Sequence, residues 1–156
     1  MIMTDPKEKL SEHFTLGEMT ASSSHPEIYN VPPPAYVDNL RRLCSWLEEL
    51  RRTYAESYCD CRDTPLRISS GYRSEKLNRA VGGERQSNHL TGCAADIRCD
   101  SCAQAVRYAA LLLDIAAQRA EPFDELIIEK KFTHFWLHFA VRPTNNRLKV
   151  TCIVKG

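Results

Sequence analysis

The sequence predicts an α+β fold in which an antiparallel sheet is flanked by helices. Helical and strand-like segments occur in separate blocks rather than in regular alternation, which argues against a doubly wound parallel sheet. Three short β-like segments follow one another near the end of the chain. The 156 residues suit one domain, so we expect a single domain over residues 1–156, with residues 1–33 as a lead-in segment packed on it.

Capping signals and apolar spacing predict the helices. Thr15 and Ser101 are each followed three residues later by Glu or Gln, the spacing of a capping box. Apolar residues after Ala35 recur in steps of three and four, which is typical of an amphipathic helix. The predicted helices are a short one beginning near residue 15, one over about 35–54, one or two turns within 74–80, and one over about 101–119.

Short runs bounded by turn residues predict the strands. The predicted strands are residues 66–70, 93–98, 123–129, 134–141 and 148–154. Gly71 ends the first, and Asn145 and Asn146 mark the turn before the last. We expect the last three strands to form an antiparallel meander.

Charge and hydropathy exclude several classes of protein. The formal net charge is only +1, which argues against a nucleic-acid binder or a polybasic membrane-surface protein. No apolar run approaches the roughly 18 residues that a membrane span requires. The N-terminal residues lack the basic and apolar regions of a secretory signal. We therefore expect a protein that is cytoplasmic as synthesised, and that stays there or leaves by a route that the sequence does not encode. We also expect a monomer.

The seven cysteines favour free thiols, because an odd number in a chain without a signal argues against a disulfide framework. Two other interpretations remain open. Cys59 and Cys61 could join Cys99 and Cys102 in a structural zinc site of four thiolates, although the first pair is closely spaced for such a site. A disulfide could also form after export.

Three residues suggest a metal site. Asp96 lies seven positions after His89 among small and apolar residues, and a carboxylate in such surroundings needs a partner. That partner could be a metal ion, an arginine or a turn amide. His138 lies within an aromatic strand, where it is either a core histidine or a ligand. Two histidines and a carboxylate with an open fourth position are a recurrent catalytic zinc set.

These residues lie in a pattern that resembles the zinc D-Ala-D-Ala carboxypeptidase family. The pattern is Ser-x-His-x-x-Gly-x-Ala-x-Asp over residues 87–96, followed by Trp-x-His over 136–138. Further matching segments are residues 14–18, 32–34, 39–43, 70–74 and 77–83. The resemblance covers about residues 10–142.

The resemblance implies a Hedgehog/D,D-peptidase fold and a zinc peptidase that cuts peptide bonds in bacterial peptidoglycan stem peptides. Family members include free carboxypeptidases and phage endolysins, so the resemblance implies that the chain acts on the cell wall if it is released by a phage or helper route. The implied Zn²⁺ ligands are His89, Asp96 and His138, and the implied substrate-binding residues are Arg73 and Ser87. The small residues Gly92 and Ala94 would let the backbone pass close to the metal pocket. Metal binding should weaken below about pH 6, because a ligating imidazole must be neutral.

One departure from the family pattern concerns the general acid or base. Relatives carry it three residues before the last zinc histidine, where this chain has Phe135. The candidates are Glu129 and, as a second choice, His134. If a hairpin closed by residues 130–135 pairs Glu129 with Trp136, Glu129 shares a face with His138. The alternative function is a non-catalytic wall-binding or phage-tail module that keeps the fold and has lost the acid.

Overall fold

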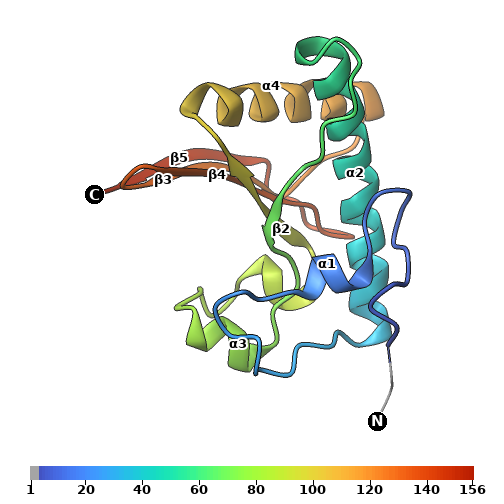
Figure 1. Cartoon of the computed structure of the whole chain (residues 1–156), viewed down its shortest axis with the longest axis vertical. Coiled ribbons are helices and arrows are strands. Elements are labelled where there is room, and N and C mark those ends of the chain that lie inside the picture. Colours follow the sequence, from blue (N-terminus) through green and yellow to red (C-terminus); the bar gives the residue numbers. More distant parts are fainter. Residues whose placement is uncertain (1–3) are drawn as a thin grey trace.

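The computed structural model describes residues 4–156 and contains one five-stranded sheet with helices on both of its faces (Figure 1). The elements in chain order are α1 (Leu16–Thr20), α2 (Pro34–Tyr58), β1 (Ile68–Ser70), α3 (Glu75–Ala80), the 3-10 helix η1 (Asn88–Thr91), β2 (Ala94–Cys99), α4 (Cys102–Arg119), β3 (Glu125–Lys131), β4 (His134–Ala140) and β5 (Lys149–Lys155). The α+β prediction is therefore confirmed.

The sheet has the strand order β1-β2-β4-β3-β5. The first three pairings are antiparallel, but β5 pairs with β3 in parallel. The expected antiparallel meander is therefore wrong for its last strand. The chain returns along β3 because the Leu148 amide donates to the Phe123 carbonyl at 3.0 Å, while Arg147 binds the fully buried carboxylate of Asp124. These contacts join residues that are more than twenty positions apart.

The hairpin between β3 and β4 has the predicted register. Glu129 pairs with Trp136 and Ile127 pairs with His138. The turn is tighter than the predicted closure over residues 130–135, since the strands continue to Lys131 and resume at His134. Phe132 in the turn has a φ of 56°, a left-handed conformation that lets two residues reverse the chain.

Both predicted capping boxes begin helices. The Thr15 hydroxyl accepts from the Glu18 amide at 3.2 Å, and the Ser101 hydroxyl accepts from the Gln104 amide at 3.1 Å. Helix α2 begins one residue earlier than predicted, at Pro34, because proline at the first helical position lacks an amide that would otherwise be unpaired. It also continues four residues beyond the predicted end. Within residues 4–156, no helix combines the length and apolar character needed to cross a bilayer.

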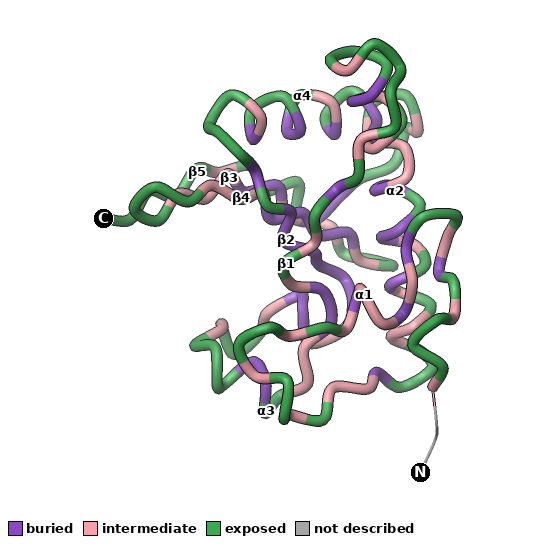
Figure 2. Tube along the Cα trace, viewed as in Figure 1, coloured by how far each residue is buried: buried purple, intermediate pink, exposed green. Residues whose placement is uncertain are grey.

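The hydrophobic core lies between one face of the sheet and the helices α2 and α4. Trp46 of α2 packs on Phe139 of β4 with ring centroids 5.4 Å apart, and Tyr54 packs on Tyr108 at 4.7 Å. Buried residues follow the side of α4 that faces the sheet, while its outer turns are exposed (Figure 2). Phe14 of the N-terminal segment is also part of this core. Each such large apolar side chain contributes about 1.5–3 kcal/mol to stability.

The opposite face of the sheet carries the polar residues. Side chains alternate between the two faces along a strand. Asp96 and His138 therefore point away from the hydrophobic core, toward α3 and η1. This face therefore holds the candidate site.

Candidate metal centre

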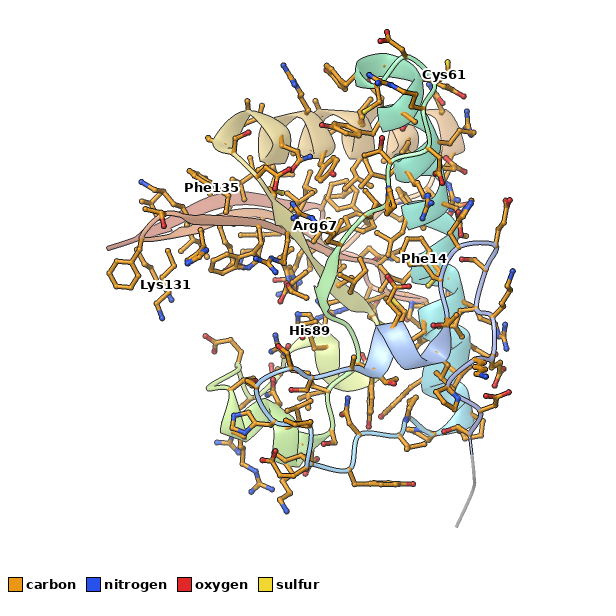
Figure 3. The ribbon with its side chains drawn as sticks, viewed as in Figure 1. Phe14, Cys61, Arg67, His89, Lys131 and Phe135 are labelled. Carbon is orange, nitrogen blue, oxygen red and sulfur yellow. The ribbon has the colours of Figure 1, made fainter. Side chains whose placement is uncertain are left out.

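His89, Asp96 and His138 come together on the polar face of the sheet. Asp96 and His138 are direct cross-strand partners on β2 and β4, and His89 reaches them from η1, which lies below the sheet in Figure 3. The Nε2 atom of His89 is 3.3 Å from Asp96 Oδ2, and Nδ1 of His138 is 3.0 Å from Asp96 Oδ1. All three residues are buried. Their potential ligand atoms lie within 4.8 Å of one another.

The orientation of His89 is fixed by its backbone surroundings. Its Nδ1 atom lies 2.7 Å from the Gly71 carbonyl oxygen, which can only accept, so Nδ1 carries a proton and Nε2 is the nitrogen that faces Asp96. Gly71 is close to α1, where a Cβ atom would collide with the carbonyl oxygen of Met19. Glycine therefore lets the strand end approach α1 while its carbonyl holds the histidine.

Ser87 and Gly92 define the turn that carries His89. The Ser87 hydroxyl caps η1 by accepting from the His89 amide at 3.2 Å. Gly92 ends η1 with a φ of 72°, and a Cβ atom there would lie 2.6 Å from the Tyr36 carbonyl oxygen of α2. Gly92 is thus needed for a left-handed turn and for close packing against α2. The expected reason was a different one, namely that a small residue lets the backbone pass close to the metal pocket.

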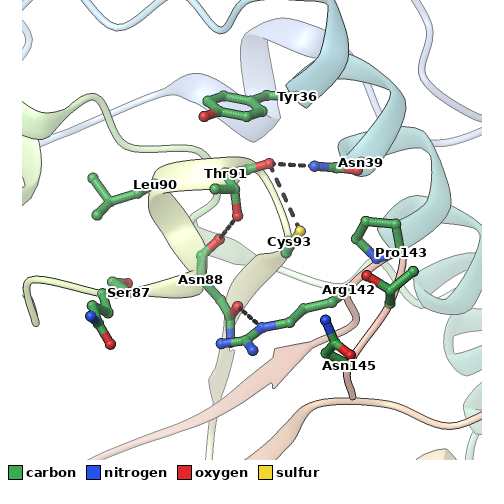
Figure 4. A pocket seen from close by; sticks show the side chains of 12 residues that line it. Tyr36, Asn39, Ser87, Asn88, Leu90, Thr91, Cys93, Arg142, Pro143 and Asn145 are labelled. Atoms are coloured by element: carbon green, nitrogen blue, oxygen red, sulfur yellow. Dashed lines mark hydrogen bonds between the residues drawn. The ribbon is translucent and has the colours of Figure 1, made fainter.

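Ser87 also lines a pocket beside η1 with a volume of about 450 Å³ (Figure 4). The walls of this pocket come from α2, from η1 and from the segment after β4. They include Tyr36, Asn39, Leu90, Thr91, Arg142 and Asn145. The structure therefore gives the serine both a capping contact and a position at the edge of a cavity.

Arg73 contacts the carboxylate of the cluster. Its Nη2 atom is 3.3 Å from Asp96 Oδ2, Nε donates to Ser70 Oγ at 2.8 Å, and Nη1 donates to Asn78 Oδ1 at 3.3 Å. Only 15% of the side chain is exposed. The guanidinium is therefore held by the protein itself, and its charge stabilises the ionised form of Asp96.

Glu129 and His134 lie on the same face as the cluster at different distances along the hairpin. Glu129 is half-buried and diagonal to His138 in the β3–β4 pairing. Burial and the neighbouring charge of Asp96 raise the pKa of Glu129 above its ordinary value, against the charge of His138 and the nearby indole of Trp136, which lower it. His134 is exposed at the first position of β4, four residues from His138. Phe135, between these positions, packs against the hydrophobic core.

Sequence reasoning missed Glu125, which contacts the other side of the His138 ring. Its Oε1 atom is 3.2 Å from His138 Nε2 and accepts from Asn88 Nδ2 at 2.6 Å. The signal was available in the strand period, because Glu125 lies four positions before Glu129 and so shares its face.

The charges of the cluster are strongly coupled. Burial alone would raise the pKa of Asp96, but His89 and His138 outweigh it and hold that pKa well below its usual range. Burial would likewise lower the pKa of His138, but hydrogen bonds to Asp96 and Glu125 raise it to about 9. The hydrogen bond with His138 lowers the pKa of Glu125 to about 2. The metal-free cluster thus places a protonated imidazole where a cation could bind.

The donor set fits a zinc ion. Two imidazole nitrogens and one carboxylate oxygen are ligands that Zn²⁺ accepts, and three protein ligands leave the open position of a catalytic site. The second group of potential ligands within residues 4–156 consists of Glu12, His13 and Glu48, which lie at the surface or are partly buried. It lacks the enclosure of the first group.

The cysteines take no part in either group. All seven lie within the described residues as free thiols. None of them belongs to a cluster of potential metal ligands in the described part of the chain. The arrangement of Cys59, Cys61, Cys99 and Cys102 around one zinc ion is therefore not formed.

In a comparison with family models, residues 12–135 match the model described as Peptidase M15. The matched range includes His89, Asp96 and Glu129 and ends before His138. The inclusion of His138 in the cluster rests on the strand pairing and distances given above. No curated protein matches the chain.

Proposed function

The chain belongs to the peptidase M15 family, and from this premise we propose that it is a zinc-dependent peptidase acting on peptide bonds in bacterial peptidoglycan stem peptides. The observation that carries the proposal is the buried group of His89, Asp96 and His138, whose donors suit zinc. The substrate class follows from the resemblance of this motif to the zinc D-Ala-D-Ala carboxypeptidase family. The reaction would be that of a D-Ala-D-Ala carboxypeptidase or a phage-type lysin.

The cluster would hold the zinc ion and Glu129 would move the proton. When bound, zinc supplies a Lewis acid for the scissile carbonyl and lowers the pKa of a water to near 7. We assign Glu129 to accept the proton of the attacking water and to return it to the leaving amine. Burial supports this role, because a raised pKa makes the Glu129 carboxylate a stronger base toward the attacking water and brings its protonated form, which must return the proton, nearer to neutral pH.

Arg73 and Ser87 are the proposed substrate-binding residues. Three of the five N–H donors of Arg73 are used by Ser70, Asn78 and Asp96, which leaves two for a substrate carboxylate or carbonyl. A planar guanidinium suits that contact better than an ammonium. Ser87 would contribute from the edge of the pocket beside η1.

The test is the substitution Glu129→Gln in zinc-loaded protein. It removes the basic oxygen while keeping the size of the side chain, so hydrolysis should fall by about 100- to 10,000-fold with zinc content unchanged. The assay is mass spectrometry of muropeptides after incubation with purified peptidoglycan. Glu121→Gln, at an exposed carboxylate after α4, is the matched control and should retain full hydrolysis. Full activity of Glu129→Gln would contradict the assignment, and His134 would then be the next residue to test.

A non-catalytic wall-binding or phage-tail module is the second candidate. The observation in its favour is that Phe135, at the usual acid position, faces the core. The same assay separates the two functions. A wild-type protein that holds zinc and binds peptidoglycan without releasing any product would be such a module.

A further inference from the structure

We infer that Glu125 is a positioning residue for the metal ligand His138, which it holds in the tautomer that presents Nδ1 to the metal. This inference rests on the proposed zinc site. The Nδ1 atom of His138 faces Asp96 at 3.0 Å, so it is the nitrogen that joins the cluster. The opposite nitrogen, Nε2, must then carry the hydrogen, and the Glu125 carboxylate accepts it at 3.2 Å.

The carboxylate of Glu125 is itself fixed by Asn88. Asn88 Nδ2 donates to Glu125 at 2.6 Å and to Asp124 at 2.7 Å, while its Oδ1 accepts from Arg142 Nε at 2.8 Å (Figure 4). The amide therefore has one orientation, with its nitrogen toward two carboxylates and its oxygen toward a guanidinium. Asn88 is buried, so these bonds are shielded from solvent.

Asn88 and His89 are neighbours in η1, and this connects the surroundings of the two histidine ligands, His89 and His138. His89 reaches the cluster directly, while Asn88 reaches it through Glu125 and His138. The short helix that carries one ligand thus also supports the residue that orients another. Ser87, which caps this helix, stabilises both contacts.

The position of Glu125 differs from that of a catalytic base. It lies on the Nε2 side of the His138 ring, whereas Asp96 lies on the Nδ1 side. The imidazole therefore separates Glu125 from the atoms that would hold the metal. Arg147, whose Nη2 atom is 3.6 Å from Glu125 Oε2, approaches from the chain segment that leads into β5.

The test compares zinc affinity in the full chain with Glu125→Gln and Glu125→Leu, using a competing chelator at pH 9, where protons compete least. Glu125→Gln keeps an oxygen that accepts the His138 hydrogen, so the zinc affinity of this variant should stay within about threefold of wild type. Glu125→Leu removes the acceptor and should weaken zinc binding about 10- to 100-fold. Glu121→Leu is the matched control at an exposed site and should bind like wild type. Wild-type affinity of Glu125→Leu would overturn the inference.

A second measurement identifies the liganding nitrogen of His138 in the wild-type protein, so it does not depend on whether any variant folds. Long-range ¹H–¹⁵N spectra of the zinc-loaded wild type should show His138 with a protonated Nε2 and a metal-bound Nδ1. Metal bound at Nε2 would overturn the inference even if Glu125→Leu does not fold.

The two proposals fail in different ways. A wild type that takes up no zinc overturns both of them. A wild type that binds zinc through Nδ1 of His138, and loses affinity in Glu125→Leu, supports the inference even where no peptide hydrolysis is detected.

Discussion

The metal-free protein should lose stability as the pH rises from 6.5 to 9, because His138 gives up a favourable charge. Asp96 and Glu125 raise the pKa of this buried imidazole from an ordinary 6.5 to about 9 in the folded state. A raised pKa contributes stability that is fully present below the unfolded pKa and is lost as the pH rises through the folded pKa. At 1.36 kcal/mol per pH unit, the contribution of this group is about 3 kcal/mol.

The assay is urea unfolding of wild type and His138→Gln with a chelator present. The variant lacks this titration, so the difference between the two free energies of unfolding cancels the other groups. That difference should shrink by about 3 kcal/mol between pH 6.5 and pH 9.5. NMR titration of the metal-free protein should place the midpoint of His138 near 9. A free-energy difference that does not change with pH, together with a midpoint near 6.5, would refute the reasoning.

Zinc affinity should show the opposite trend with pH. Zinc must displace the proton from His138, so the apparent affinity should rise about tenfold per pH unit from 6.5 until the pH approaches 9. The sequence alone predicts weakening only below about pH 6. The structure indicates that protons compete with zinc for His138 up to a higher pH, because Glu125 is a second carboxylate in contact with the imidazole.

Two further substitutions test how the site is held. Gly71→Ala places a Cβ against the Met19 carbonyl oxygen and displaces the acceptor of His89. Urea unfolding should therefore show a loss of about 1–3 kcal/mol, and chelator competition should show a weaker zinc affinity. Gly82→Ala is the control for zinc affinity: its φ of 71° makes the substitution cost stability, but its Cβ meets no atom within 4 Å, so zinc affinity should stay at the wild-type value. Equal zinc affinities in the two variants would count against this role of Gly71. Trp136→Phe removes the indole N–H, which lowers the pKa of Glu129, so the acid limb of the kcat/KM profile should move to higher pH. An unchanged limb would exclude Glu129 as the group that the limb reports.

The local parts of the fold were predictable because their causes are local. The capping boxes at Thr15 and Ser101 use side chains and amides three residues apart, so their spacing is visible in the sequence. The β3–β4 hairpin was predictable, but its register only as a condition, because a slip of one residue would send Glu129 to the other face. The structure has the register that pairs Glu129 with Trp136, so Glu129 lies on the face of His138.

The parts that were missed depend on contacts between distant residues. The parallel pairing of β5 with β3 follows from Arg147 binding the buried Asp124, and no pattern along the chain predicts that ion pair. Arg73 could be matched to the family motif, but its contact with Asp96 requires β2 to lie beside the segment after β1. Such contacts are properties of the folded arrangement rather than of any one segment.

Two carboxylates on one strand reach opposite acid–base properties at this site. Glu125 and Glu129 share a face of β3, four residues apart. The hydrogen bond with His138, together with Asn88 and Arg147, lowers the pKa of Glu125 to about 2, so it stays ionised and serves as a fixed acceptor. Burial and the charge of Asp96 raise the pKa of Glu129, so it can gain and lose a proton nearer to neutral pH. Environments that separate two pKa values also separate the roles of the groups, so the strand would supply both the proposed orienting residue and the proposed proton carrier.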